Sequence, residues 1–248
     1  MKQLLLMIAS LALPLHAGAS APSINVGSMY EYAEPGKGAL LKRVRNTGDA
    51  TAFVRVQVTE VQYGADGKAT ENDVDTSSIG NGRPALIASP SRLIVPAQGQ
   101  QATRLLLQGN RQVERYYRVR FIPVLPRSEN EFALSPVEAE EYRKHLSAGV
   151  NVLTGYGVFV IVRPDSVHYD VRTEADANGT VLRNTGNTTV ILDDLRHCSV
   201  QEKDERCSPA RRLHLLPGRS HHFPRTGGEM HRFHVVEGDA RKAVRIDS

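Results

Sequence analysis

Short stretches of alternating apolar and polar residues run through most of this chain. Phe53 to Val58 and Tyr117 to Ile122 alternate with a period of two, which is typical of strands with one buried face. Arg104 to Gln108 and Gly157 to Val162 are shorter and more apolar, as in buried strands. Turn-forming residues separate these stretches. Short strands at this spacing predict an all-β fold built from β-sandwiches.

A seven-residue motif that occurs twice indicates two sandwiches in tandem. Arg45 to Thr51 (RNTGDAT) recurs as Arg183 to Thr189 (RNTGNTT). The Asn-Thr-Gly corner predicts a tight turn in which glycine is free to take a positive φ. A strongly apolar strand ends at Arg163, and Pro164 would interrupt its hydrogen-bond ladder. We therefore expect an N-terminal domain in residues 22–163 and a C-terminal domain in residues 164–248.

The first residues have the pattern of an export signal. Lys2 precedes an apolar stretch from Leu4 to Leu15, and Ala19-Ser20-Ala21 fits a small-residue cleavage site. The stretch is too short to span a membrane as a helix, although a membrane anchor is the alternative. Residues 1–21 are thus interpreted as a cleaved signal peptide. This predicts a periplasmic protein with no inserted segment.

The charge pattern argues against a nucleic-acid partner. Removing Lys2 lowers Lys plus Arg from 31 to 30, against 27 Asp plus Glu, so the formal net charge becomes +3. Nucleic-acid-binding domains concentrate basic residues on one face beside aromatic ones. Here the charges are scattered and tryptophan is absent.

The chain has two cysteines, Cys198 and Cys207. In an exported protein, two cysteines this close together predict one disulfide across a short polar loop. A metal or redox pair is the alternative, and it would need a C-x-x-C motif or suitably spaced histidines.

One long segment, Leu125 to Gly149, lacks the strand pattern. Within it, Ser135-Pro136-Val137-Glu138 resembles a helix start, with serine as the cap, proline in the first turn and glutamate three residues later. The pattern favours a short helix that extends to Leu146. Loops of this length in compact domains are usually functional or disordered.

The sequence contains no catalytic motif of the common hydrolase, metalloprotease or phosphate-binding types. The C-terminal domain is rich in histidine, which leaves metal binding as an alternative. His231 and His234 would point to opposite faces of a strand, and so would His221 and His222. We therefore expect no metal, no cofactor and no enzymatic activity.

Arg118 and Arg120 share one face of an expected strand, opposite Tyr117, Val119 and Phe121. If that face lines a groove, the two guanidinium groups could hold a carboxylate. The alternative is a solvent-exposed strand face.

The stretch from Val150 to Val160 is long and apolar on both faces. It follows the long loop, so its first half could form an exposed edge strand. An exposed apolar edge invites pairing with another chain, which indicates use in β-strand addition. The alternative is an ordinary central strand.

Several short motifs follow one another along the mature chain: Ser89 to Gln98, Arg104, Arg115 to Val119, Leu182 to Asn187, Cys198 and Cys207, and Leu215 to Ser220. In this order they resemble the PapD-like periplasmic pilus chaperones. The likeness is greater to the chaperones of the alternate and common-pilus (Ecp/Cfa-type) chaperone–usher systems. It covers nearly the whole mature chain.

The resemblance implies two immunoglobulin-like sandwiches set in an L shape. It implies that the N-terminal domain lends its last strand to an incomplete pilus (fimbrial) subunit and hands that subunit to an outer-membrane usher, without a cofactor. The inserted side chains would be Val150, Val152 and Thr154, then Tyr156 and Val158. A register shift of one residue would present Asn151, Leu153 and Gly155 instead.

The chain departs from the family at one site. The better-known members anchor the subunit's C-terminal carboxylate with an arginine on the first strand and a lysine on the donor strand. The corresponding positions here hold Tyr30 and Phe159, which cannot bind a carboxylate. Arg118, Arg120 or Lys42 could take over this role.

A structural or accessory pilus component with the same fold is the main alternative function. Such a protein should carry an N-terminal donor extension, and Pro22 to Val26 is a poor one. A periplasmic metal binder or enzyme is a third possibility, and a metal binder would gain thermal stability with zinc or copper.

Overall fold

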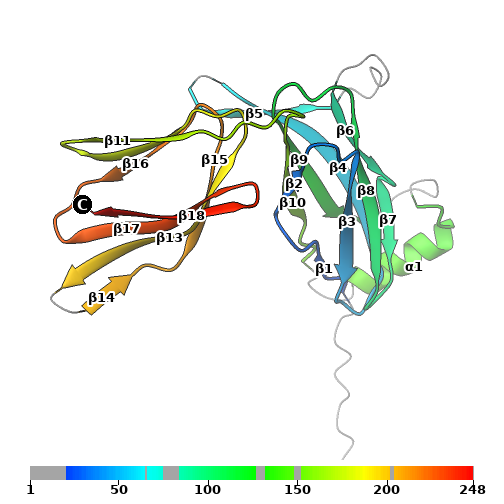
Figure 1. Cartoon of the computed structure of the whole chain (residues 1–248). Coiled ribbons are helices and arrows are strands. Elements are labelled where there is room, and N and C mark those ends of the chain that lie inside the picture. Colours follow the sequence, from blue (N-terminus) through cyan, green and yellow to red (C-terminus); the bar gives the residue numbers. More distant parts are fainter. Residues whose placement is uncertain are drawn as a thin grey trace, which may run out of the picture.

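The computed structural model of the chain consists of two β-sandwich lobes joined by a short segment (Figure 1). The structure describes residues 21–64, 66–74, 84–126, 132–147, 152–201 and 204–247. Residues 1–20 of the predicted signal sequence lie outside this range, and so does Val150. Strands up to Val162 form the first lobe and strands from Val171 form the second.

The N-terminal lobe contains two packed sheets. The four-stranded sheet holds, in spatial order, β1 (Ile24–Asn25), β3 (Ala39–Asn46), β8 (Gln100–Gln108) and β6 (Ala85–Ser89). The second sheet holds β2 (Tyr30–Ala33), β10 (Tyr156–Val162), β9 (Arg115–Pro123), β4 (Ala52–Tyr63) and β5 (Ala69–Asp73), with β7 (Arg92–Val95) paired to β4. Their inward side chains form one core around Val44, Leu105, Val119 and Phe121. The alternation predicted for β4 and β9 is confirmed.

The C-terminal lobe also packs two sheets. The smaller holds β11 (Val171–Asp176), β12 (Gly179–Asn184) and β16 (Ser220–Pro224). The larger holds β14 (Asp204–Cys207), β13 (Val190–Gln201), β17 (Glu229–Glu237) and β18 (Ala240–Asp247), with β15 (Arg211–Leu215) paired to β13. Leu182, Leu192, Phe223 and Phe233 lie in the core between them.

The two Asn-Thr-Gly corners have the same structure in both lobes. Asn46 and Asn184 are fully buried, and each donates from Nδ2 to the carbonyl oxygen of the residue four positions later, at 2.7 Å and 2.8 Å. The corner glycines, Gly48 and Gly186, do not use the positive φ that is open to glycine. A Cβ on Gly48 or Gly186 would lie 2.1 Å or 2.4 Å from the backbone oxygen of a neighbouring segment. Glycine is required there because two chain segments pass close together.

The predicted helix is present as α1 (Pro136–Ser147). Ser135 Oγ accepts a hydrogen bond from the Glu138 N–H (3.3 Å), and the Glu138 carboxylate accepts one from the Ser135 N–H (2.8 Å). This capping box fixes the helix start. The helix packs on the outside of β4, where the Tyr142 ring meets Phe53 edge to face at 4.8 Å.

The predicted disulfide joins Cys198 on β13 to Cys207 on β14. Because it closes a loop in the unfolded chain, Cys198→Ser combined with Cys207→Ser is expected to lower the free energy of unfolding by about 2–3 kcal/mol. Denaturant unfolding measures the change, and we expect partner specificity to stay the same. Loss of binding at unchanged stability would contradict a purely structural role.

Candidate binding edge and interlobe pocket

Strand β10 has a neighbour along its whole length on one side only. Strand β9 pairs with it from Tyr156 to Val162, whereas β2 runs parallel to its other side only from Phe159 to Val162. The Phe159 N–H donates to the carbonyl oxygen of Met29 (2.8 Å), where this second pairing begins. Among the residues that the structure describes, none pairs with that edge from Tyr156 to Val158. We call these three residues the open edge, since a strand from another chain can add there.

The residues before the open edge are not part of the sheet. The sequence predicts a strand from Val150, but β10 starts at Tyr156, and residues 152–155 have no strand pairing. Gly155 lies beside the end of β9, where a Cβ would come within 3.1 Å of the Phe121 carbonyl oxygen. Pro123 ends β9 and has no N–H to donate. Residues 152–155 therefore have no strand partner among the residues that the structure describes.

The side chains predicted to enter a subunit differ in exposure. Val152 is 78% exposed, more than any other large apolar side chain in the described residues. Thr154 is exposed, and Tyr156 packs partly against the N-terminal core. Val158 is fully buried in that core, so it is not available to a partner, contrary to the prediction. In an extended chain Val152, Thr154 and Tyr156 would continue the core-facing side of β10 beyond the end of the core.

Arg118 and Arg120 meet at one carboxylate. Arg118 Nε donates to one oxygen of Glu71 (2.9 Å), and an Arg120 terminal nitrogen donates to the other (2.6 Å). Burial opposes ionisation of Glu71, but hydrogen bonds from Thr59, Arg120 and Arg118 lower its pKa, so it stays charged at neutral pH. The carboxylate that these arginines hold in the free chain is thus its own, from β5.

Lys42 is not close to these arginines. It lies on the inward face of β3 with 4% exposure, and its Nζ binds the Ser28 carbonyl oxygen (2.6 Å) and a Glu31 carboxylate oxygen (2.5 Å). It lines a different depression from Arg118 and Arg120. In the free chain the charge of Lys42 is thus buried and already paired, which does not favour the suggestion that it anchors a partner's carboxylate.

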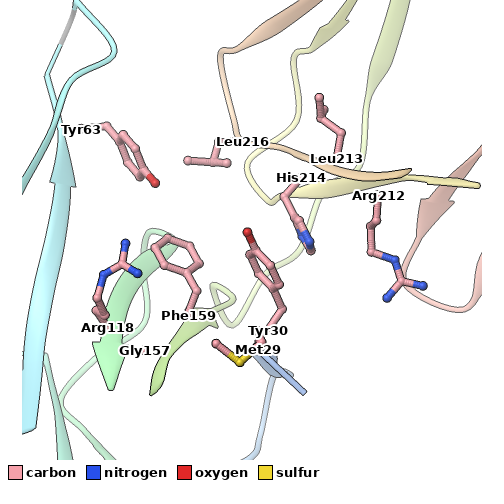
Figure 2. Close-up of a pocket in the computed structure, with 10 residues that line it drawn as sticks. All are labelled: Met29, Tyr30, Tyr63, Arg118, Gly157, Phe159, Arg212, Leu213, His214 and Leu216. Atoms are coloured by element: carbon pink, nitrogen blue, oxygen red, sulfur yellow. The ribbon is translucent and has the colours of Figure 1, made fainter. Parts of the chain in front are cut away.

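A pocket of about 470 Å³ lies between the two lobes, next to the open edge. Figure 2 shows Tyr63, Leu216, Tyr30 and Phe159 around an open space. Tyr30 and Phe159, the two positions where the resemblance implied a carboxylate anchor, both line this pocket. They are direct neighbours across β2 and β10, and their rings meet edge to face at 5.9 Å. The residues lining the pocket are Met29, Tyr30, Tyr63, Arg118, Gly157, Phe159, Arg212, Leu213, His214 and Leu216.

His214 closes the pocket from the C-terminal lobe. Its ring stacks on Tyr30 with 3.8 Å between centroids, and its Nδ1 lies 2.5 Å from the Tyr32 hydroxyl. Burial, together with the nearby charge of Arg212, lowers the pKa of His214 to about 4. The ring is therefore neutral at neutral pH, and its Nδ1 accepts the Tyr32 O–H.

A buried polar network joins the two lobes, and no local sequence pattern indicates it. Arg163 is 3% exposed and donates to the Thr188 hydroxyl (2.6 Å), the Thr189 carbonyl oxygen (3.1 Å) and Glu34 (3.1 Å). The Glu114 carboxylate accepts from the Thr188 hydroxyl (2.6 Å) and the Thr189 N–H (2.8 Å). These bonds fix the interlobe pocket by holding its two sides together.

The C-terminal histidines do not assemble a metal site in the described ranges, where no three His, Cys, Asp or Glu residues are placed to hold an ion. His197 and His231 stack at 4.8 Å across β13 and β17. Burial lowers the pKa of His231 and of His221.

No helix of the described part of the chain is long and apolar enough to cross a membrane.

Comparison with known proteins relates this geometry to one class of protein. No protein-family model matches the chain. The chain is 26% identical over 233 residues to the probable fimbrial chaperone EcpB of Escherichia coli O157:H7, which covers 92% of this chain and 94% of the relative. The chain is thus similar to probable fimbrial chaperones over nearly its whole length. The same identity and coverage hold for the EcpB of a laboratory strain, K12.

Solved structures show that this chain has the predicted fold of two immunoglobulin-like sandwiches. It superposes on the class 5 fimbriae chaperone CfaA with a TM-score of 0.57 at 17% identity, covering 91% of this chain and 99% of the other. For the E. coli chaperone DraB the TM-score is 0.54 at 15% identity, and the match covers 92% of this chain and 100% of DraB. For a chain of the CsuC–CsuE chaperone–tip adhesion subunit complex of Acinetobacter baumannii the TM-score is 0.52 at 13% identity. The match covers 90% of this chain and 97% of the other.

Proposed function

We propose that this chain is a periplasmic chaperone that binds fimbrial subunits through the open edge of β10 and delivers them to an outer-membrane usher. The observation that carries the proposal is the open edge, together with the exposed, unpaired Val152 just before it. The curated relatives are named fimbrial chaperones, and one structural neighbour is a chaperone bound to a tip adhesion subunit.

Binding of this kind rests on two physical contributions. Backbone groups of the open edge would pair with a subunit strand, which gives affinity with little dependence on sequence. Val152, Thr154 and Tyr156, with Val150 before them, would place side chains into the subunit's unfinished core, which gives specificity. No covalent bond is made or broken, so the mechanism needs no catalytic group, cofactor, metal or nucleic acid.

The proposed location follows from the first residues. The pattern of Lys2, the apolar stretch from Leu4 to Leu15 and the small residues up to Ala21 supports export and cleavage after Ala21. The oxidised Cys198–Cys207 pair is consistent with an oxidising compartment such as the periplasm.

Periplasmic co-expression with the secreted β-rich proteins encoded beside this chain tests the proposal. A tagged chain should co-purify in equal amount with at least one of them, and the subunit expressed alone should aggregate or be degraded. The purified complex should not exchange its subunit for a second tagged copy of the chain within minutes. Recovery of the chain alone in every pairing would contradict the proposed function.

A further inference from the structure

Exposed apolar side chains gather at the pocket between the lobes. Met29, Tyr30 and Tyr63 are 40%, 44% and 37% exposed, and all three line it. Exposed apolar groups that cluster in this way usually mark a binding site. The volume of about 470 Å³ falls in the range of small-ligand pockets, about 300–1,000 Å³.

The pocket lies where a strand added to the open edge must end. From Phe159 onward that edge is occupied by β2, because the Phe159 N–H already donates to the Met29 carbonyl oxygen. An incoming strand therefore stops beside Gly157 and Val158. Side chains of a strand alternate between its two faces, and Gly157 and Phe159 lie on the pocket side of β10. The last side chain of the incoming strand on that face would meet the pocket.

The charges around the pocket favour an uncharged group. Arg118 is held by Glu71 at 2.9 Å, and Arg212 is held by Asp193 at 2.8 Å. In Figure 2 the Arg212 guanidinium points away from the open space. His214 is neutral at neutral pH because burial lowers its pKa to about 4. Each cation that lines the pocket thus already has a carboxylate partner.

The walls select among uncharged groups. The rings of Tyr30, Tyr63 and Phe159 and the thioether of Met29 offer edge-to-face, stacked and sulfur–aromatic contacts, all of which favour another aromatic ring. We propose that the interlobe pocket binds an aromatic side chain near the end of the subunit strand that pairs with β10. The inference rests on the proposed function, and it assigns the pocket to side-chain recognition rather than to a terminal carboxylate.

Methyl NMR can test the pocket in the free chain. Residues 22–248 contain two methionines, Met29 in the pocket and Met230 in the C-terminal core at 4% exposure, so labelled methionine methyls give a probe and an internal control. N-acetylphenylalaninamide should shift the Met29 signal by its ring current, with a dissociation constant of about 1–10 mM. The Met230 signal should not move. N-acetylalaninamide should have no effect, and N-acetylphenylalanine, which carries a carboxylate, should bind no more tightly than the amide.

Variants of Tyr63 complete the test. Tyr63→Ala removes one wall and should weaken the amide about tenfold, whereas Tyr63→Phe keeps the ring and should retain binding. Tighter binding of the free acid by tenfold or more, equal binding of the alanine derivative, or no shift of Met29 would each overturn the inference. The titration needs no subunit, so its failure alongside successful subunit capture removes this inference and leaves the proposed function standing. Binding of the amide without capture of any subunit would show that the pocket accepts an aromatic ring, but it would contradict the proposed function and, with it, the assignment of the pocket to a subunit side chain.

Discussion

Val152→Asp is expected to reduce subunit capture by at least about 100-fold while leaving the free chain folded. In the free chain this side chain is 78% exposed, and changes at exposed positions usually alter stability by less than about 0.5 kcal/mol. In the proposed complex it enters the subunit's core. Burying an unpaired carboxylate there costs several kcal/mol, about 3 or more. The readout is co-purification from the periplasm, with thermal unfolding of the free variant beside it.

The chain offers a matched control for this experiment. Val137 on α1 is also a valine with an exposed side chain, at 66%, but it lies away from the open edge. Val137→Asp adds the same charge at a similar exposure and should leave capture unchanged. Equal loss of capture in both variants would point to a general effect of added charge. If Val152→Asp fails to fold, Val152 is a core residue and its assignment to the donor segment is wrong.

Local patterns along the chain are sufficient to predict much of the fold. Three of these patterns depend only on residues that are close in sequence. They are the alternation in β4 and β9, the corners at Asn46 and Asn184, and the capping box at Ser135. The exposed start of the donor segment is also visible, because an apolar stretch follows a long loop. The extent of the paired strand is not visible in the sequence. Strand β10 can begin only where β9 still has an N–H to donate, and Pro123, at the end of β9, has none.

Contacts between distant residues account for most of what the sequence did not predict. Arg118 and Arg120 share a face, as the alternation predicts, but their partner Glu71 lies 47 and 49 residues away. The case of Lys42 is different. It alternates with exposed Leu41 and Arg43 and lies on the same inward face as Val44, so a strict period of two already indicates a buried lysine that needs an internal partner.

The junction between the lobes also depends on contacts between residues that are distant in sequence, and it determines the shape of the pocket. Arg163 follows an apolar strand directly, so a buried charge there is detectable in the sequence. Its partners Thr188 and Glu34 are 25 and 129 residues away. The pocket takes residues from both lobes, including Phe159 and His214. Its shape therefore depends on this junction and not on either sandwich alone.

Arg163→Ala is therefore expected to lower the free energy of unfolding by about 3 kcal/mol, because it removes a buried side chain and leaves the buried Thr188 hydroxyl and Thr189 carbonyl oxygen without their donor. The Arg163 guanidinium also lies 4.8 Å from the centre of the Tyr32 ring and 5.5 Å from that of Tyr169, and these cation–π contacts are lost as well. We expect denaturant unfolding to change from one transition to two, as the lobes unfold separately. The Met29 methyl signal should broaden or shift, since the pocket loses its fixed geometry.

Arg172→Ala is the control for this variant. Its side chain is 67% exposed and pairs with Asp170 at 3.2 Å, an exposed ion pair of the kind that contributes about 0–1 kcal/mol. It should leave the unfolding curve and the Met29 signal nearly unchanged. Arg163→Lys keeps the charge but cannot reach Thr188, Thr189 and Glu34 with one planar group, so we expect an intermediate loss. If Arg163→Ala unfolds in a single transition at unchanged midpoint, the polar network does not couple the lobes, and the pocket must be held by the stacking of Tyr30 on His214 instead.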